Sequence, residues 1–432
     1  MALRHWDFAR CARAREAGNS FVIGHSPLVI LTRFVHPELR SRFNADFTPE
    51  KYAALLRCVN ETAKWPADFR VSETPIFLTR EFHDELVAAA KEIVGKTRTP
   101  EFARHAATAI PPGLEVPNET THPAFLVVDF GICTVENRLI PRLIELQAFP
   151  SLYGFQLLLL GCMRKAYPAI PRHWTSAFGG MQDDDYLKLL RKTIVADSDP
   201  QNVILLEIEP AKQKTRVDFA CTESILGISP VSVTEISKRG RQLFYRRDGR
   251  EVPIERIYNR VIFDELLRRP ELNLPFSFQE ELEVVWIGHP NWYFRISKHS
   301  LPFLKSPYSS SAFFADEFPT DKSISDFVLK PLYSFAGLGV DMEPNREKLA
   351  ALSKPREWIL QEKVQYAEFV RTPDGPKSKA EIRMMFIWPD DEPDPILVNN
   401  LVRMSQGKMM GVDFNKDKTW VGSSIALHER GS

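Results

Sequence analysis

The sequence predicts a fold that mixes helices and strands, of class α+β (α/β), built from several structural units. Short apolar runs typical of buried strands recur from residue 124 to the end of the chain. Amphipathic helical spacing also occurs, most clearly in Phe82–Val94. The length of 432 residues is typical of about two to four units. Hydrophobic residues make up 44% and charged residues 26%, which is close to a soluble globular average.

The charge balance excludes two classes of partner. The chain carries 56 Lys and Arg against 56 Asp and Glu, so its formal net charge is zero. A dedicated nucleic-acid binder needs a basic footprint, and a polybasic membrane binder needs clustered Lys and Arg. The longest apolar runs, such as Phe155–Leu160, are far shorter than the ~20 residues of a membrane helix. We therefore expect neither nucleic acid nor a membrane as a partner.

Cysteine usage and the N-terminal sequence predict a cytoplasmic protein. An odd and scattered set of cysteines without a CxxC pair argues against a disulfide scaffold or a zinc ribbon, so we expect reduced, buried thiols. The first residues are charged throughout and lack the apolar core of a signal peptide. The five cysteines are Cys11, Cys58, Cys133, Cys162 and Cys221.

Residues 1–110 are expected to be mostly helical. In Phe82–Val94 the apolar residues recur at helical spacing and the acidic residues come early, which predicts a packing helix. A loop follows at Pro111-Pro112-Gly113.

Two apolar runs after this loop predict a buried β-hairpin. Ala124–Gly131 and Pro141–Gln147 are separated by the turn-like sequence CTVENR. Three polar residues interrupt the runs: Asp129, Glu145 and Gln147. Glu145 and Gln147 are two apart, so their side chains point to the same face.

Residues 202–260 predict a small α/β unit with a partly parallel sheet. A strand at Val203–Ile208 precedes a helix at Arg216–Gly227 that ends at a glycine. The next strand is expected at Ser229–Thr234. Asp248-Gly249 predicts a tight turn between two further strands. One helix and four strands are expected outside this unit: Phe155–Lys165, then Phe327–Lys330, Trp358–Gln361, Glu381–Ile387 and Ile396–Met404.

A loop with two glycines follows the strand that ends at Lys330, in the sequence KPLYSFAGLG. A phosphate-binding loop needs backbone N–H groups that can approach oxygens, and a lysine that offsets negative charge. The loop is not a Walker A motif, because no GK[ST] follows. It is not a dinucleotide fingerprint either, because no third glycine opens a helix. An ordinary β-hairpin with a flexible tip fits the same residues.

Two further sets of polar residues indicate chemistry. Arg383 and Arg403 each lie in an apolar strand, where an arginine is costly unless it meets an anion, so they predict a phosphate or carboxylate site. The alternative is that both face solvent on edge strands. Oxygen ligands from Asp129, Glu145 and Gln147 suit Mg²⁺, which prefers carboxylates with phosphate oxygens and water. A solvent-facing strand pair is the alternative, although the rest of both strands is strongly apolar.

Taken in order, these segments resemble the ATP-grasp superfamily. The glycine loop is followed by the strand WILQEKV, by Glu381-Ile382-Arg383 and by a strand with Arg403. Lys298 lies where that superfamily carries its earlier nucleotide lysine. In most members a Glu-x-Asn strand comes last, whereas the similar segment here, Glu145-Leu146-Gln147, comes first. This order is similar to that of the circularly permuted ATP-grasp proteins, such as glutathionylspermidine synthetase.

The resemblance covers about residues 120–425 and implies a division of the chain. The implied parts are a family-specific helical region (1–110), the metal-binding part of the ATP-grasp C-lobe (111–200), a pre-ATP-grasp α/β domain (201–290), the N-lobe with the glycine loop (291–365) and the rest of the C-lobe (366–432).

The resemblance also implies ATP and Mg²⁺ as cofactors and a role for each candidate residue. Two lysines would contact the α- and β-phosphates, the glycine loop would cover the β- and γ-phosphates, and residues 361–364 would meet adenine. The arginines would stabilise the transferred phosphoryl group or orient a carboxylate. The implied residues are, for the nucleotide, Lys298, Lys330, Ala336, Gly337, Leu338, Gly339, Gln361, Glu362, Lys363 and Val364; for magnesium, Asp129, Glu145 and Gln147; and for catalysis, Arg383 and Arg403.

The implied reaction is ATP-dependent carboxylate–amine ligation. A carboxylate attacks the γ-phosphate to give an acyl phosphate and ADP, and an amine then displaces phosphate. The substrates would be a small-molecule or peptide carboxylate and an amine. Two alternatives are a phosphotransferase that uses the same nucleotide site and a non-catalytic nucleotide-binding scaffold. Two departures favour the scaffold: Gln147 replaces an asparagine, and Val127 stands where the glutathionylspermidine enzymes carry an arginine.

Overall fold

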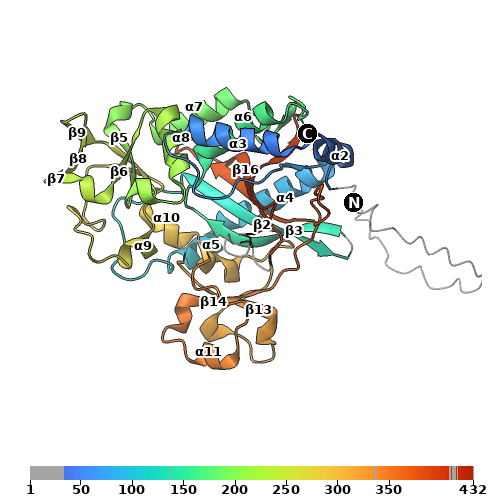
Figure 1. The fold of residues 1–432 in the computed structure, drawn as a ribbon. Helices are drawn as coiled ribbons and strands as arrows, with labels where there is room; N and C mark the ends of the chain where they lie inside the picture. The colour runs from blue at the N-terminus through green and yellow to red at the C-terminus, as the bar shows by residue number, and fades with distance from the viewer. Residues whose placement is uncertain are drawn as a thin grey trace, which may run out of the picture.

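A five-stranded antiparallel sheet lies at the centre of the computed structural model, which describes residues 34–136, 138–334, 337–407, 410, 415 and 417–431. β2 and β3 form the predicted hairpin, and β15 pairs with β2 so that strands from distant parts of the chain share one sheet (Figure 1). In spatial order the strands are β17 (Gly422–Ser424), β16 (Ile396–Ser405), β15 (Lys379–Ile387), β2 (Phe125–Val135) and β3 (Arg138–Gln147).

The two faces of this sheet carry separate apolar cores. Because side chains alternate along β2, Leu126 and Val128 pack on one face with α4 (Arg80–Thr97). Phe125 packs on the other face with α6 (Tyr153–Ala166). Both helices contain the stretches that their apolar spacing predicts.

The described residues before position 110 are mostly helical, as predicted. α3, α4 and α5 each begin after a threonine whose hydroxyl accepts a backbone N–H of the first turn, which satisfies a donor that the helix leaves open. Among the described residues, the α-helices outside the α/β unit and the small lobe described below are α2 (Pro37–Asp46), α3 (Pro49–Thr62), α4, α5 (Pro100–Ala106), α6 and α7 (Asp183–Ile194). A three-stranded sheet joins β1 (Ile76–Phe77), β18 (Ala426–Glu429) and β4 (Trp174–Thr175).

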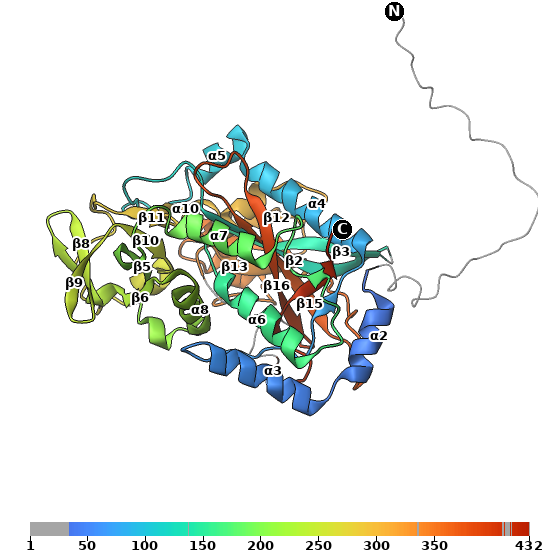
Figure 2. The same cartoon turned by 90° about the horizontal axis from the view of Figure 1, so that it is seen from above.

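A disulfide between Cys58 and Cys162 joins α3 to α6, which lie side by side in Figure 2. This corrects the expectation that all the thiols are reduced. The two cysteines are 104 positions apart in the sequence, so only the packing of α3 on α6 reveals the pair. Cys133 and Cys221 are buried free thiols, as expected, and Cys11 lies outside the described residues. Because stable disulfides form in oxidising compartments, the cysteines no longer support a cytoplasmic location.

The predicted α/β unit lies at one end of the molecule (Figure 1). α8 (Arg216–Leu226) connects two parallel strands and ends at Gly227, whose φ of 74° favours glycine. The predicted turn at Asp248-Gly249 joins β8 to β9. The parallel sheet contains β11 (Val285–Ile287), β10 (Arg256–Asn259), β5 (Val203–Glu207) and β6 (Ser229–Ser232), and an antiparallel sheet contains β7 (Ser237–Arg239), β8 (Gln242–Arg247) and β9 (Arg250–Ile254). Two short helices follow, α9 (Phe263–Leu267) and α10 (Pro290–Arg295).

A small lobe lies below the rest of the molecule in Figure 1. It consists of an antiparallel sheet and the helix α11 (Arg346–Ala350). It has its own apolar core, to which Phe318, Phe327 and Leu360 belong. Its strands are β12 (Ala312–Phe314), β14 (Trp358–Glu362) and β13 (Phe327–Pro331), and the last two confirm the predicted strands. No helix in the described ranges is long and apolar enough to cross a membrane.

Candidate functional site

Four charged side chains from three neighbouring strands meet on one face of the central sheet. Asp129 of β2 lies opposite Arg383 of β15, and Glu381 of β15 lies opposite Arg403 of β16. Glu381 and Arg383 are two residues apart, so they point to the same face. The predicted arginine pair therefore meets a predicted acid, and neither arginine lies on an edge strand of this sheet.

Asp129 accepts hydrogen bonds from both arginines. Nε and Nη2 of Arg383 lie 2.6 and 2.7 Å from its two oxygens, and Nη2 of Arg403 lies 2.6 Å from Oδ2. Burial alone would raise the pKa of Asp129, but the two guanidinium groups outweigh burial and hold this pKa at about 2. Asp129 is therefore ionised near neutral pH, and both of its oxygens are engaged.

Glu381 and Tyr366 complete this network, and neither was predicted as a site residue. Glu381 Oε2 lies 2.9 Å from Nη2 of Arg403, and the Tyr366 hydroxyl donates to Glu381 Oε1. Burial raises the pKa of Tyr366 well above its ordinary value. A Cβ at Gly131 would come within 2.8 Å of the Tyr366 ring, so the close approach of this ring requires glycine. The spacing from Arg383 could have indicated Glu381, whereas no sequence signal marks Tyr366.

A pocket opens beside this network, between β3, the segment around Lys298 and the residues after β13. Lys298 Nζ lies 2.9 Å from Glu145 Oε1 and donates to the carbonyl of Ser334 at 2.7 Å. Burial would raise the pKa of Glu145, but Lys298 holds it below its ordinary value. Residues that line the pocket include Glu145, Gln147, Tyr293, Lys298, Tyr333 and Ser334.

Lys330 extends the site toward the small lobe. Its Nζ donates to Gln361 Oε1 at 2.6 Å, and Gln361 Nε2 donates to the carbonyl of Leu143 on β3 at 3.0 Å. Burial lowers the pKa of Lys330 to about 8, although the nearby charge of Glu145 partly opposes this shift. Glu145 also lies opposite Asp129 in the hairpin. The structure therefore brings the predicted residues Asp129, Glu145 and Lys330 together in one place.

Other predicted nucleotide residues lie away from the pocket. The side chains of Glu362 and Lys363 are exposed and bind the backbone of residues 311 and 325. Leu338 is 54% exposed, and Gly337 and Gly339 both have positive φ, which glycine adopts readily. Ala336 lies outside the described residues. Of the described positions 337–339 and 361–364, which include Val364, none lines the pocket.

The donor set does not fit the magnesium site that the resemblance implies. Mg²⁺ needs open carboxylate oxygens, but arginine donors take both oxygens of Asp129, and Gln147 Oε1 lies 3.4 Å from Nη2 of Arg383. The two lysines and two arginines also outnumber the carboxylates Asp129, Glu145 and Glu381. Across the part of the chain that the structure describes, no three His, Cys, Asp or Glu residues group to hold a metal. In this structure the partners of Asp129 are the two arginines, and its metal role stays a prediction.

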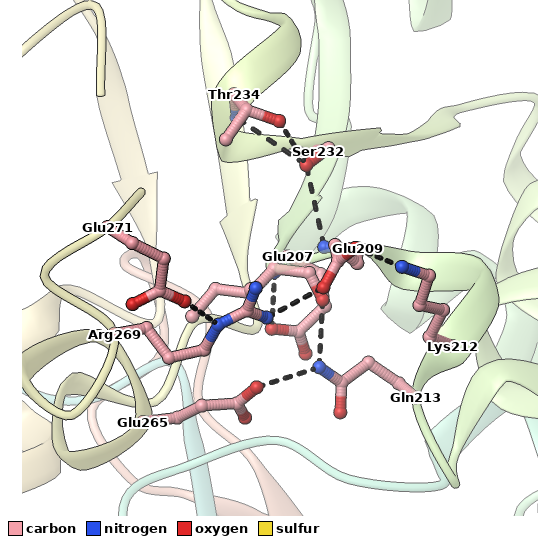
Figure 3. Close-up of polar contacts among 10 residues, drawn as sticks. Glu207, Glu209, Lys212, Gln213, Ser232, Thr234, Glu265, Arg269 and Glu271 are labelled. Atoms are coloured by element: carbon pink, nitrogen blue, oxygen red, sulfur yellow. Dashed lines mark hydrogen bonds and ion pairs between the residues drawn. The ribbon is translucent and has the colours of Figure 1, made fainter. Parts of the chain in front are cut away.

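A second polar cluster, not predicted as a site, lies after β5 in the α/β unit (Figure 3). Arg269 lies between Glu209 and Glu271, with Nη1 2.6 Å from Glu209 Oε2 and Nε 2.9 Å from Glu271 Oε1. Glu207 is buried, and burial raises its pKa to about 8 although the Arg260 charge opposes the shift. These contacts hold the loop after β5 to the segment around Arg269.

The comparisons with known proteins bear on the fold. No family model matches the chain, and no curated protein matches it. Among solved structures, the chain is similar to a glutathione synthetase-like effector (GSS30) from Globodera pallida in its apo form. The match covers 94% of this chain and 97% of that chain, with a TM-score of 0.51 and 10% identity. The similarity shows a glutathione synthetase-like fold, and not specifically the glutathionylspermidine synthetase type that the motif order resembles.

Proposed function

We propose that the chain is an ATP-dependent carboxylate–amine ligase with a nucleotide site of the ATP-grasp type. One observation carries this proposal. Lys298, Lys330 and Glu145 come from separate segments of the sequence and meet beside one pocket, between the central sheet and the small lobe. The glutathione synthetase-like fold supports the same class of reaction.

In this proposal the protein acts through position and charge. The ammonium groups of Lys298 and Lys330 neutralise the phosphates of ATP, and the arginine pair meets the transferred phosphoryl group. A substrate carboxylate attacks the γ-phosphate, which releases ADP and leaves an acyl phosphate. The amine then attacks the acyl carbon, so that an amide forms and phosphate leaves. The rings of Tyr293 and Tyr333 line the pocket and limit the access of water to the acyl phosphate.

A non-catalytic nucleotide-binding protein is the second candidate. The carboxylates of Asp129 and Glu145 already pair with cations of the protein. Such pairs stabilise a fixed arrangement of charges, which suits binding at least as well as turnover.

The test is a screen for ADP release against panels of carboxylates and amines. We expect one combination to give ADP, phosphate and an amide. Glu145→Ala should abolish ADP release, because this carboxylate faces the pocket and holds Lys298. Glu362→Ala is the matched control, since Glu362 is an exposed acid away from the pocket.

Each other outcome has a defined meaning. Unchanged turnover in Glu145→Ala, with wild-type melting behaviour, would contradict the proposed site. A phosphorylated acceptor in place of an amide would indicate a phosphotransferase. Tight ATP binding without any turnover would support the second candidate.

A further inference from the structure

The arginine pair on the central sheet is held as a fixed unit. Asp129 is buried and binds Arg383 through two hydrogen bonds and Arg403 through a third. A guanidinium that binds a carboxylate through two parallel hydrogen bonds is fixed in orientation as well as in distance. The side chain of Arg383 is only 9% exposed, so the surrounding protein also restricts it.

Glu381 holds Arg403 from a second direction. Its Oε2 lies 2.9 Å from the same Nη2 that binds Asp129, and the Tyr366 hydroxyl fixes its other oxygen. Arg403 is thus anchored at one nitrogen by two buried carboxylates.

Arg403 keeps donors that none of the described residues uses. Its side chain is 37% exposed, and its two polar contacts with described residues both run through Nη2. Its Nε is buried and has no acceptor within the described part of the chain. A guanidinium offers five N–H donors, and a buried donor without an acceptor is costly. The exposed part of the guanidinium can donate to a ligand oxygen, whereas a metal cation offers no acceptor.

We propose that Asp129 and Glu381 are positioning residues, and that the two arginines they hold bind the terminal phosphate of a polyphosphate ligand without a divalent cation at Asp129. The inference rests on the proposed function for the nature of the ligand. Arginine N–H groups already take three of the about four lone-pair sites of this buried carboxylate, so a magnesium ion on Asp129 would lie against a guanidinium group. It would also add positive charge where the cations of the protein already outnumber the carboxylates.

The test measures binding of inorganic tripolyphosphate by calorimetry, first in EDTA and then with added MgCl₂. We expect the wild-type protein to bind in EDTA. Arg403→Gln should weaken this binding about tenfold, which is the loss of one charge-assisted contact. Arg246→Gln, which removes an exposed arginine of β8, is the matched control and should change nothing.

Asp129→Asn separates a positioning role from a metal role. We expect it to weaken metal-free binding by a similar factor, and Arg403→Gln to add little in the Asp129→Asn background, because the two residues act as a unit. The inference is overturned if the wild-type protein binds only with Mg²⁺. It is also overturned if Asp129→Asn raises the Mg²⁺ concentration that binding needs and leaves metal-free binding intact.

Two checks keep these outcomes interpretable. If Asp129→Asn fails to fold, Arg403→Gln carries the test, because its side chain is partly exposed. Unchanged tripolyphosphate binding in Arg403→Gln then overturns the inference. If the ADP screen fails while tripolyphosphate binding behaves as expected, only the ligase proposal is lost, and the reverse result removes only the inference.

Discussion

Lys330, beside the pocket, is a cation whose charge changes with pH not far above neutrality. Burial lowers its pKa to about 8, while the carboxylates of Glu145 and Glu381 oppose the shift and the ammonium of Lys298 adds to it. Asp129, held at about 2, does not titrate in the same range. The pocket is therefore most positive below pH 8, and it loses one charge above that value.

The affinity for ATP should fall as the pH rises through about 8. The protonated lysine attracts phosphate and the neutral amine does not, so the lost charge weakens binding, by about tenfold for a single charged contact. Calorimetric titrations between about pH 6.5 and 9.5 measure this dependence. Lys330→Arg keeps its charge over the whole range and should flatten the profile. An equal fall in both proteins would show that Lys330 is not the titrating group.

At the scale of elements, the local sequence pattern predicted many of the helices and strands, but it did not predict which distant strands pair. The spacing of apolar residues predicted α4, α6, the β2–β3 hairpin and strands β13 to β16, because burial on one face imposes a period on the sequence. Asp129, Glu145 and the two arginines were singled out for the same reason, as polar residues inside apolar strands. Their partners could not be predicted, because the pairing of β15 with β2 decides which charges meet. The contacts of Tyr366 and the Cys58–Cys162 bond depend on packing between distant segments.

The bond between α3 and α6 should stabilise the protein measurably. It closes a loop with a sequence separation of 104, and a disulfide of this kind contributes roughly 2–4 kcal/mol by restricting the unfolded chain. We expect Cys58→Ser to lower the free energy of unfolding by about that amount. Unfolding in denaturant, followed with and without reductant, measures this free energy. Reductant should destabilise the wild-type protein and Cys221→Ser, which keeps the disulfide, but not Cys58→Ser. A wild-type protein that is indifferent to reductant would contradict the assignment.

At the scale of the molecule, the site lies where two bodies meet. The small lobe has its own core and contributes Lys330 and Gln361, while the central sheet contributes Glu145 and the arginine pair. The bond from Gln361 to the carbonyl of Leu143 connects them directly. A ligand that binds cations from both bodies would link them more firmly than this contact does.

ATP should therefore slow hydrogen exchange in the small lobe. We expect the amides of β13 and β14 to exchange more slowly with ATP, because bound phosphates hold Lys330 and reduce local opening of the lobe. The amides of β7 to β9, at the far end of the α/β unit, should not change (Figure 1). Hydrogen exchange followed by mass spectrometry resolves both regions in one sample. Adenosine, which lacks phosphates, is the matched control and should have no effect on β13. Equal protection by adenosine, or protection spread over β7 to β9, would show that the phosphates do not join the two bodies.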